Sequence, residues 1–363
     1  MKVLILGGYG NFGKRIAELL TRQGIGVIVA GRDAAKAAKL AAALPSGLAE
    51  PATFDVTSEL PHQLERWQPG IVINTCGPFQ GAGYGVARAC IAAGVHYIDL
   101  ADGRDFVAGI AQLDDEAKGR NVAVISGAST VPVLSSAVIE HVLPRFRKIH
   151  SLDYGISPGQ KTERGLATTQ AILGYVGRRL RPCAGFQIRY GWQDLHVQAY
   201  PDIGRRWMSN CEIPDLDLLP AKYGVEKIRF SAGMELSVVH LGLWLLSWAV
   251  RLKFPFDLPT YAPALLKTSL WFDRFGSADG GMHMIVEGEN HAGQRAVVNW
   301  FIIARSGDGP YIPAVPAVVL VKKFVAGRRP APGAVPCVGL ITLQDYLDEL
   351  HGFDVKTHEF TDH

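Results

Sequence analysis

A glycine-rich turn between an apolar run and a helical pattern is the feature that most constrains the fold. Residues 2–7 (KVLILG) predict a strand, and residues 12–24 (FGKRIAELLTRQG) predict a helix. The apolar run GVIVAG at 26–31 predicts a second strand. Together they form a β-α-β unit, which requires a parallel pair of strands with a helix crossing over the sheet.

The turn itself has the glycine spacing of a dinucleotide cradle. Gly8, Gly10 and Gly13 satisfy G-x-G-x-x-G between the strand and the helix. The first glycine permits the tight turn, the second lets the backbone approach a pyrophosphate, and the third lets the helix pack against the sheet. The helix N-terminus also offers unpaired N–H groups to phosphates. We therefore predict dinucleotide binding by Gly7, Gly8, Gly10, Asn11, Phe12 and Gly13.

The end of the second predicted strand indicates which dinucleotide binds. NAD usually meets an Asp or Glu there, because a carboxylate accepts a hydrogen bond from the free ribose 2′-hydroxyl. Here the strand ends in Gly31 and Arg32, and the first carboxylate is Asp33. A guanidinium pairs well with a 2′-phosphate. We therefore predict NADP(H), with NAD(H) as the alternative.

A second carboxylate follows the third predicted strand, residues 51–56. Asp55 is placed to accept a hydrogen bond from the adenine amine of the nucleotide. Alternatively, Asp55 or Thr57 caps the next helix at its N-terminus. The sequence leaves both roles open.

The pattern of predicted helices and strands changes along the chain. Up to about residue 128, Val- and Ile-rich runs alternate with helical patterns, as in a parallel sheet covered on both faces. Later strands are longer, and residues 282–305 alternate apolar and polar side chains around the turn NHAGQ. We predict an α/β fold: a doubly wound Rossmann sheet and a second α+β domain on a mixed, partly antiparallel sheet. The predicted domains are 1–129 with 312–363, which bind the dinucleotide, and 130–311, which binds substrate or dimerises.

Residues 74–106 carry a family resemblance. They read NTCGPFQGAGYGVARACIAAGVHYIDLADGRDF. This segment resembles the saccharopine dehydrogenase (saccharopine reductase-like) superfamily, whose pattern is N-x-x-G-P-[FY], an Ala-Cys pair in a helix, then A-G-x-x-Y-x-D. The resemblance implies an NADP(H)-dependent oxidoreductase that transfers a hydride to or from a C–N or C=C centre. The matching positions are Asn74, Gly77, Pro78, Phe79, Ala89, Cys90, Ala93, Gly94, Tyr97 and Asp99.

The loop after the fourth predicted strand lies at the carboxyl edge where a dinucleotide crosses a Rossmann sheet. Gly77 and Pro78 fix a turn that brings backbone close to the nicotinamide ribose. Phe79 either walls the nicotinamide ring or packs in the core. Cys76 is expected to be a small buried residue beside the cofactor, since no neighbouring group would activate its thiol.

Two carboxylates end the fifth predicted strand on the same edge. A nicotinamide enzyme needs a proton donor or acceptor near the hydride site. The resemblance places an acidic residue shortly after its Y-x-D pattern. Asp102 and Asp99 are therefore the candidate catalytic residues.

Composition excludes several other classes. The net charge is +3 and the sequence has no long run of Lys or Arg, so no nucleic-acid partner is predicted. The five cysteines form no C-x-x-C pair, and with a strand-like N-terminus they predict reduced thiols in a cytoplasmic protein. Strand alternation places four residues on one face, which we interpret as a solvated face rather than a metal site: His283, Glu287, Glu289 and His291.

The predicted second domain gives less information about the small-molecule substrate. Several arginines are available for a carboxylate-bearing substrate: Arg164, Arg178, Arg189, Arg205 and Arg206. However, residues 235–254 are strongly apolar, and residues 258–275 are rich in Trp and Leu. The helix at 236–250 fits a core or homodimer interface, or a peripheral membrane contact. The alternatives to the main function are an acyl-lipid (enoyl) reductase with a hydrophobic substrate, and a non-catalytic NAD(P)-binding protein at a membrane surface.

Overall fold

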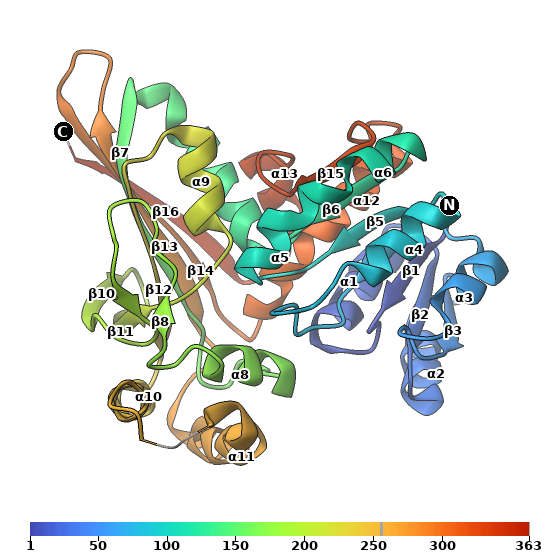
Figure 1. Ribbon diagram of the computed structural model, residues 1–363, viewed down its shortest axis with the longest axis horizontal. Coiled ribbons are helices and arrows are strands. Elements are labelled where there is room, and N and C mark those ends of the chain that lie inside the picture. The colour runs from blue at the N-terminus through green and yellow to red at the C-terminus, as the bar shows by residue number, and fades with distance from the viewer. Residues whose placement is uncertain (255–256, 363) are drawn as a thin grey trace. The chain divides into compact units, whose positions relative to one another are not determined.

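The computed structural model describes residues 1–254 and 257–362 and divides into two compact units. The first unit comprises residues 1–137 and 311–350. The second comprises residues 138–310 and the segment from His351 onward. Each unit has its own sheet (Figure 1).

The first unit contains a seven-stranded sheet in the order β15-β6-β5-β4-β1-β2-β3, in which all neighbouring strands are parallel. The strand order reverses at β1, which pairs with both β2 and β4. Ligands of doubly wound folds bind at the carboxyl ends of strands at such a switch point. The strands are β1 (Val3–Leu6), β2 (Val27–Gly31), β3 (Ala49–Thr53), β4 (Ile71–Asn74), β5 (His96–Asp99), β6 (Ala123–Ser126) and β15 (Gly333–Pro336).

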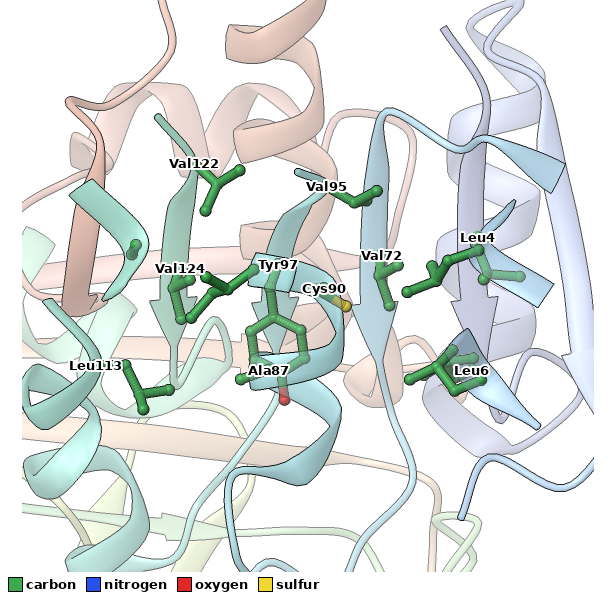
Figure 2. Close-up of a cluster of buried hydrophobic side chains, with 14 of the residues drawn as sticks. Leu4, Leu6, Val72, Ala87, Cys90, Val95, Tyr97, Leu113, Val122 and Val124 are labelled. Carbon is green, nitrogen blue, oxygen red and sulfur yellow. The ribbon is translucent and has the colours of Figure 1, made fainter. Parts of the chain in front are cut away.

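Helices connect these strands, as parallel pairing requires. Alternate residues of the central strands point to one face of the sheet, where α3, α4 and the segment 110–119 cover them (Figure 2). The helices are α1 (Asn11–Arg22), α2 (Ala34–Ala43), α3 (Leu60–Trp67), α4 (Gly85–Ala93), α5 (Arg104–Gly109), α6 (Asp114–Gly119), α12 (Val315–Val325) and α13 (Leu343–Asp348). The buried cluster includes Leu4, Leu6, Val72, Ala87, Cys90, Tyr97, Leu113 and Val124.

The second unit contains a mixed sheet in the order β10-β11-β12-β7-β13-β14-β16. Only β12 and β7 pair in parallel among the described strands of this sheet. The predicted hairpin is present as β13 and β14. The strands are β7 (Lys148–Ser157), β10 (His196–Tyr200), β11 (Gly204–Asn210), β12 (Lys227–Met234), β13 (Gly280–Glu289), β14 (Arg295–Ala304) and β16 (Val355–Asp362). The predicted fold class, a Rossmann sheet with a second mixed sheet, is thus confirmed.

One part of the predicted division differs from the structure. All of residues 312–363 are predicted to lie in the nucleotide domain. Strand β16, however, pairs antiparallel with β14 from Val297↔Asp362 to Ala304↔Val355, so it extends the second sheet. Its position follows from this ladder of backbone hydrogen bonds, whose partner strand a short alternating segment does not reveal.

Helix α10 (Ser237–Arg251) of the second unit has an unusual burial pattern. Its buried residues are the polar His240 and Ser247, whereas Leu245 is 61% exposed. His240 Nε2 and Ser209 Oγ are hydrogen-bonded at 2.9 Å. The apolar side of this helix is therefore open in the single chain. The other helices of the unit are α7 (Ser135–Val142), which spans the boundary between the units, α8 (Leu166–Leu173), α9 (Asp215–Tyr223) and α11 (Ala262–Trp271).

Across residues 1–254 and 257–362, no helix combines the length and the apolar character that crossing a membrane requires.

Candidate dinucleotide-binding site

The turn between β1 and α1 is built by close backbone approach. Gly7 has φ +72°, a left-handed conformation that favours glycine. The N–H of Gly10 donates to the carbonyl of Gly7 at 2.8 Å, which closes the turn. A Cβ at Gly13 would overlap the Gly7 carbonyl oxygen and approach the Gly8 Cα to 2.8 Å. Gly13 is thus the position where α1 packs against the end of the strand.

Gly10 is in a different environment. A Cβ there would meet only the Gly7 carbonyl oxygen, at 3.0 Å, and otherwise open space. Gly10 is also the N-cap of α1, and no side chain caps this helix end. The first-turn N–H groups therefore face a site with room for an anion, which fits a dinucleotide pyrophosphate.

The first residues of α1 frame this site. Asn11 and Phe12 are half-buried. The guanidinium of Arg15 donates to the main-chain oxygen of Asn11 at 2.6 Å, which holds the first turn of the helix.

The loop after β4 lies directly against the glycine turn. A Cβ at Gly7 would come within 2.7 Å of Thr75 Oγ1 and 3.2 Å of Cys76 Sγ. Thr75 Oγ1 also donates to the Leu6 carbonyl at 2.8 Å. Two segments nearly 70 residues apart thus meet at the switch point of the sheet. Thr75 is not among the predicted site residues, and its only sequence signal is its position just after a buried strand.

Within this second loop, the structure changes two expectations. Cys76 is exposed rather than buried. Protein atoms around it still displace water and raise the pKa of its thiol to about 11, so the thiol is protonated at neutral pH. Phe79 is only 6% exposed and packs on Phe106 at a ring distance of 5.2 Å, which favours the core-packing alternative. Gly77 and Pro78 are exposed.

Asp99, one of the two candidate catalytic carboxylates, is fully buried. Its Oδ1 accepts hydrogen bonds from Ala101 N at 3.0 Å, Ser126 Oγ at 2.9 Å and Gly127 N at 2.8 Å. Burial raises the pKa of Asp99 to about 6, and these hydrogen bonds offset part of the rise. Asp99 therefore ties the end of β5 to the loop after β6 and is poorly placed to reach a substrate.

Asp102 is exposed at the same edge, where its Oδ1 accepts a hydrogen bond from Gln80 Nε2 at 3.1 Å. Nearby protein atoms desolvate the carboxyl and raise its pKa, although the side chain remains accessible. A Cβ at Gly103 would approach the Phe79 backbone to 3.2 Å, so the two loops are neighbours. Of the two carboxylates, Asp102 is the one that solvent can reach.

The end of β2 presents Arg32 with its side chain exposed. Asp33 Oδ1 accepts a hydrogen bond from Lys36 N at 3.1 Å and caps α2. Lys36 Nζ pairs with Asp33 at 3.2 Å, so both charges of this turn are engaged. The guanidinium of Arg32 is the exposed cation next to the strand end.

Asp55 does not cap the next helix, which was one of its two predicted roles; its hydrogen bond to the adenine amine stays a prediction. Its Oδ1 accepts from Thr57 N at 2.8 Å and from Thr57 Oγ1 at 2.6 Å, and these bonds lower the pKa of Asp55. Helix α3 starts later and has Glu59 at its N-cap. Asp55 therefore organises the turn after β3, near the positive field of Arg32.

The β13 face that carries His283, Glu287 and Glu289 is less exposed to solvent than predicted. His283 is buried and hydrogen-bonded to Tyr200 at 2.8 Å, and burial lowers its pKa to about 3. The interpretation as a fully solvated face is wrong at this position, because β13 lies in the middle of its sheet. No group of three or more metal-ligating side chains occurs within the described parts of the chain.

The fold and the open glycine turn at the switch point define a doubly wound dinucleotide-binding protein. Residues 3–126 match the family model described as the saccharopine dehydrogenase NADP binding domain. Residues 3–126 are thus similar to the NADP binding domain of saccharopine dehydrogenases. This match agrees with the predicted family resemblance and with NADP as the predicted cofactor.

One solved structure has the same fold over the whole chain. Apo saccharopine dehydrogenase (L-Glu forming) from Saccharomyces cerevisiae is 14% identical, with a TM-score of 0.67, and the match covers 99% of each chain. Amine dehydrogenase from Mycobacterium smegmatis is 14% identical, with a TM-score of 0.48, over 93% of this chain and 95% of that one. Comparison with curated protein sequences gives no significant match.

Proposed function

We propose that the protein uses NADP(H) to transfer a hydride to or from a C–N or C=C centre of a small molecule with an apolar part. The observation that carries this proposal is the open turn at Gly10, which lies against the loop that contains Thr75. When bound, NADPH supplies the hydride. The protein's task is to hold the dinucleotide and to manage one proton.

The proposed roles follow from position. The first turn of α1 holds the pyrophosphate, and Arg32 pairs with the 2′-phosphate. Gly77 and Pro78 bring backbone toward the nicotinamide ribose. Asp102 is the proposed proton donor or acceptor, since its carboxyl is accessible and its pKa is raised.

Three of the five candidate arginines in the second unit already have carboxylate partners, which disfavours a carboxylate-bearing substrate at those three positions. Arg206 lies 3.8 Å from Glu235, and Arg178 lies 3.3 Å from Asp257. Arg164 is paired with Asp273. Binding a carboxylate at any of these would require displacing an existing partner, which costs free energy.

The role of Arg32 is tested by titrating NADPH and NADH into the wild type and Arg32→Ala. Loss of a charge-assisted pair costs about 1.5–3 kcal/mol, so we expect NADPH affinity to fall about 10- to 100-fold while NADH affinity changes little. Calorimetry measures both. Lys39→Ala, another exposed cation close in sequence, is the control and should leave both affinities unchanged. Undiminished NADPH affinity in Arg32→Ala would contradict the assignment, and failure of the wild type to bind either nucleotide would contradict the enzymatic function.

A second proposal concerns an apolar surface formed by α10, α11 and the residues that follow each helix. Several large side chains of this surface are exposed: Val238, Leu245, Trp248, Leu252, Phe254, Tyr261, Leu270, Trp271 and Phe275. Figure 1 shows α10 and α11 in the same region of the second unit. Clustered exposed apolar side chains of this size mark an interaction site.

The charges of the α10–α11 surface favour a lipid bilayer with anionic headgroups as its partner. Arg251 lies 4.9 Å from the Trp248 ring, and Arg274 lies 3.9 Å from the Trp271 ring. Exposed Lys253 adds a further cation. Within the described part of segment 235–275, Asp257 is the only exposed carboxylate. Aromatic and leucine side chains rimmed by Lys and Arg are typical of protein surfaces that lie on membranes.

Vesicle sedimentation tests this proposal with Leu245→Ser/Trp271→Ser. We expect the wild type to bind phosphatidylcholine vesicles that contain phosphatidylglycerol, and the double variant to bind them at least about tenfold more weakly. Val325→Ser is the control, because Val325 is 55% exposed but lies in the first unit. A wild type that does not bind vesicles, or that forms a dimer by light scattering which the double variant loses, would instead make this surface an interface between two copies of the chain.

A further inference from the structure

Tyr9 belongs to the glycine turn between β1 and α1, but its side chain contacts the backbone at the end of β2. A Cβ added to Gly31 would lie 2.6 Å from Tyr9 Cζ and 2.7 Å from Tyr9 Oη. The tyrosine ring therefore rests on the Gly31 backbone at the end of β2. Any larger residue at position 31 would displace the ring.

The hydroxyl of Tyr9 makes a second contact two residues further along. Tyr9 Oη accepts a hydrogen bond from Asp33 N at 2.9 Å. Asp33 in turn caps α2 through Lys36 N. Tyr9 thus fixes the backbone on both sides of Arg32, while the side chain of Arg32 stays exposed.

The charge of Arg32 lies within electrostatic range of the carboxyl edge of the sheet. Its positive charge acts on Asp55, after β3, and on Cys76, after β4. Both residues follow strands at the edge where a dinucleotide crosses the sheet. The charge of Arg32 is therefore near the place where an adenosine ribose at the end of β2 would lie.

We propose that Tyr9 is a positioning residue for cofactor specificity: by holding Gly31 and Asp33, it orients Arg32 toward the 2′-phosphate of NADP(H). This inference rests on the proposed role of Arg32. A preordered cation loses less conformational freedom when it binds, so its pairing with the phosphate is stronger. NADH has no 2′-phosphate, so its binding does not depend on this arrangement.

The test is a double-mutant cycle between Tyr9 and Arg32, read as dissociation constants for NADPH and NADH. Tyr9→Phe removes the acceptor for Asp33 N but keeps the ring over Gly31. We expect the dissociation constant for NADPH to rise about 3- to 10-fold and that for NADH to change less than about twofold. In the Arg32→Ala background, Tyr9→Phe should change neither constant.

A second variant disturbs the contact between Tyr9 and Gly31 by changing Gly31 instead of Tyr9. Gly31→Ala displaces the tyrosine ring without removing its hydroxyl. Like Tyr9→Phe, it should raise the dissociation constant for NADPH more than that for NADH. Thermal unfolding confirms that each variant is folded. The inference is overturned if both variants lose affinity for NADPH and NADH equally, or if both keep the wild-type ratio of the two dissociation constants. Either result leaves the proposed function standing. A wild type that binds neither nucleotide overturns both.

Discussion

Asp99 is a buried carboxylate whose pKa is raised to about 6 from 3.8. The folded state therefore binds its proton more tightly than the unfolded state does. Stability from this group is fully present below the unfolded pKa and is lost as the pH rises through about 6. Three donors on Oδ1 keep Asp99 in place, whereas Oδ2 has no partner among the described residues.

The Asp99→Asn variant should therefore become more stable relative to the wild type as the pH rises. Asparagine has no charge to bury, and its Oδ1 can accept the same hydrogen bonds. Relative to the wild type, we expect the variant to gain up to about 3 kcal/mol in free energy of unfolding between about pH 4 and pH 7. Urea unfolding across this range measures the difference.

Asp55→Asn is the matched control, because its stability relative to the wild type should change with pH in the opposite direction. Hydrogen bonds from Thr57 lower the pKa of Asp55, so its contribution to stability is present at neutral pH and lost in acid. This variant should lose stability relative to the wild type as the pH rises. A pH-independent difference for Asp99→Asn would show that the carboxyl titrates normally in the fold.

The sequence placed Asp99 and Asp102 at the correct edge but could not separate their roles. Their position followed from the end of an apolar run, and neighbouring residues share that signal. Burial of Asp99 depends on Ser126 and Gly127, which lie more than 25 residues away. Tyr9 and Thr75 escaped notice for the same reason, since their partners come from other strand ends.

At the scale of elements, the β1–α1 turn uses its glycines for two different purposes. Gly13 is needed for packing, because a Cβ would meet the Gly8 backbone at 2.8 Å. Gly10 has open space beyond the Gly7 carbonyl. Packing and cofactor binding therefore depend on different positions of one motif.

Alanine substitutions should separate these two purposes. Gly13→Ala should lower the free energy of unfolding by about 1–3 kcal/mol, because α1 must shift from the strand. Gly10→Ala should cost about 1 kcal/mol or less, yet weaken NADPH binding more than about tenfold, because its methyl group occupies the approach to the pyrophosphate. Thermal unfolding and NADPH titration measure both. Equal effects of the two variants on stability would contradict this division.

Helix α10 shows the limit of reading elements from composition. Its span was predictable, since a continuous apolar segment of this length favours a helix. Its environment was not, because the same residues suit a core, a dimer interface or a membrane surface. Only tertiary packing shows that His240 and Ser247 face inward while Leu245 and Trp248 face outward.

At the scale of the whole molecule, the two units are interleaved along the chain. The predicted return of the chain to the nucleotide domain ends early, because the last strand joins the second sheet. The sequence of residues 355–362 does not indicate which sheet they join, since alternation carries no information about the partner strand.

Ending the chain after Asp354 should therefore weaken the second unit selectively. Strand β14 would keep β13 but lose its second partner, β16, along Val297–Ala304. We expect the second unit to unfold with a free energy lower by about 2–5 kcal/mol, while NADPH binding stays close to wild type. Tryptophan fluorescence during urea unfolding reports mainly on this unit, because all tryptophans except Trp67 lie in it.

Phe360→Ser in the full chain is the control, since Phe360 is 51% exposed and its strand remains. This variant should unfold nearly like the wild type. Equal losses of stability and of NADPH binding in the truncated chain would show that the units do not respond separately.

The two late strands have a consequence for biosynthesis. Each sheet receives an edge strand near the end of the chain: β15 beside β6 and β16 beside β14. At about 5–20 residues per second, a ribosome needs roughly tens of seconds to make this chain. During most of that time neither sheet can be completed, and the apolar strand β14 has an open edge once it emerges. Unpaired strand edges invite association with other chains, so shielding of the nascent chain is most valuable between the synthesis of β14 and that of β16.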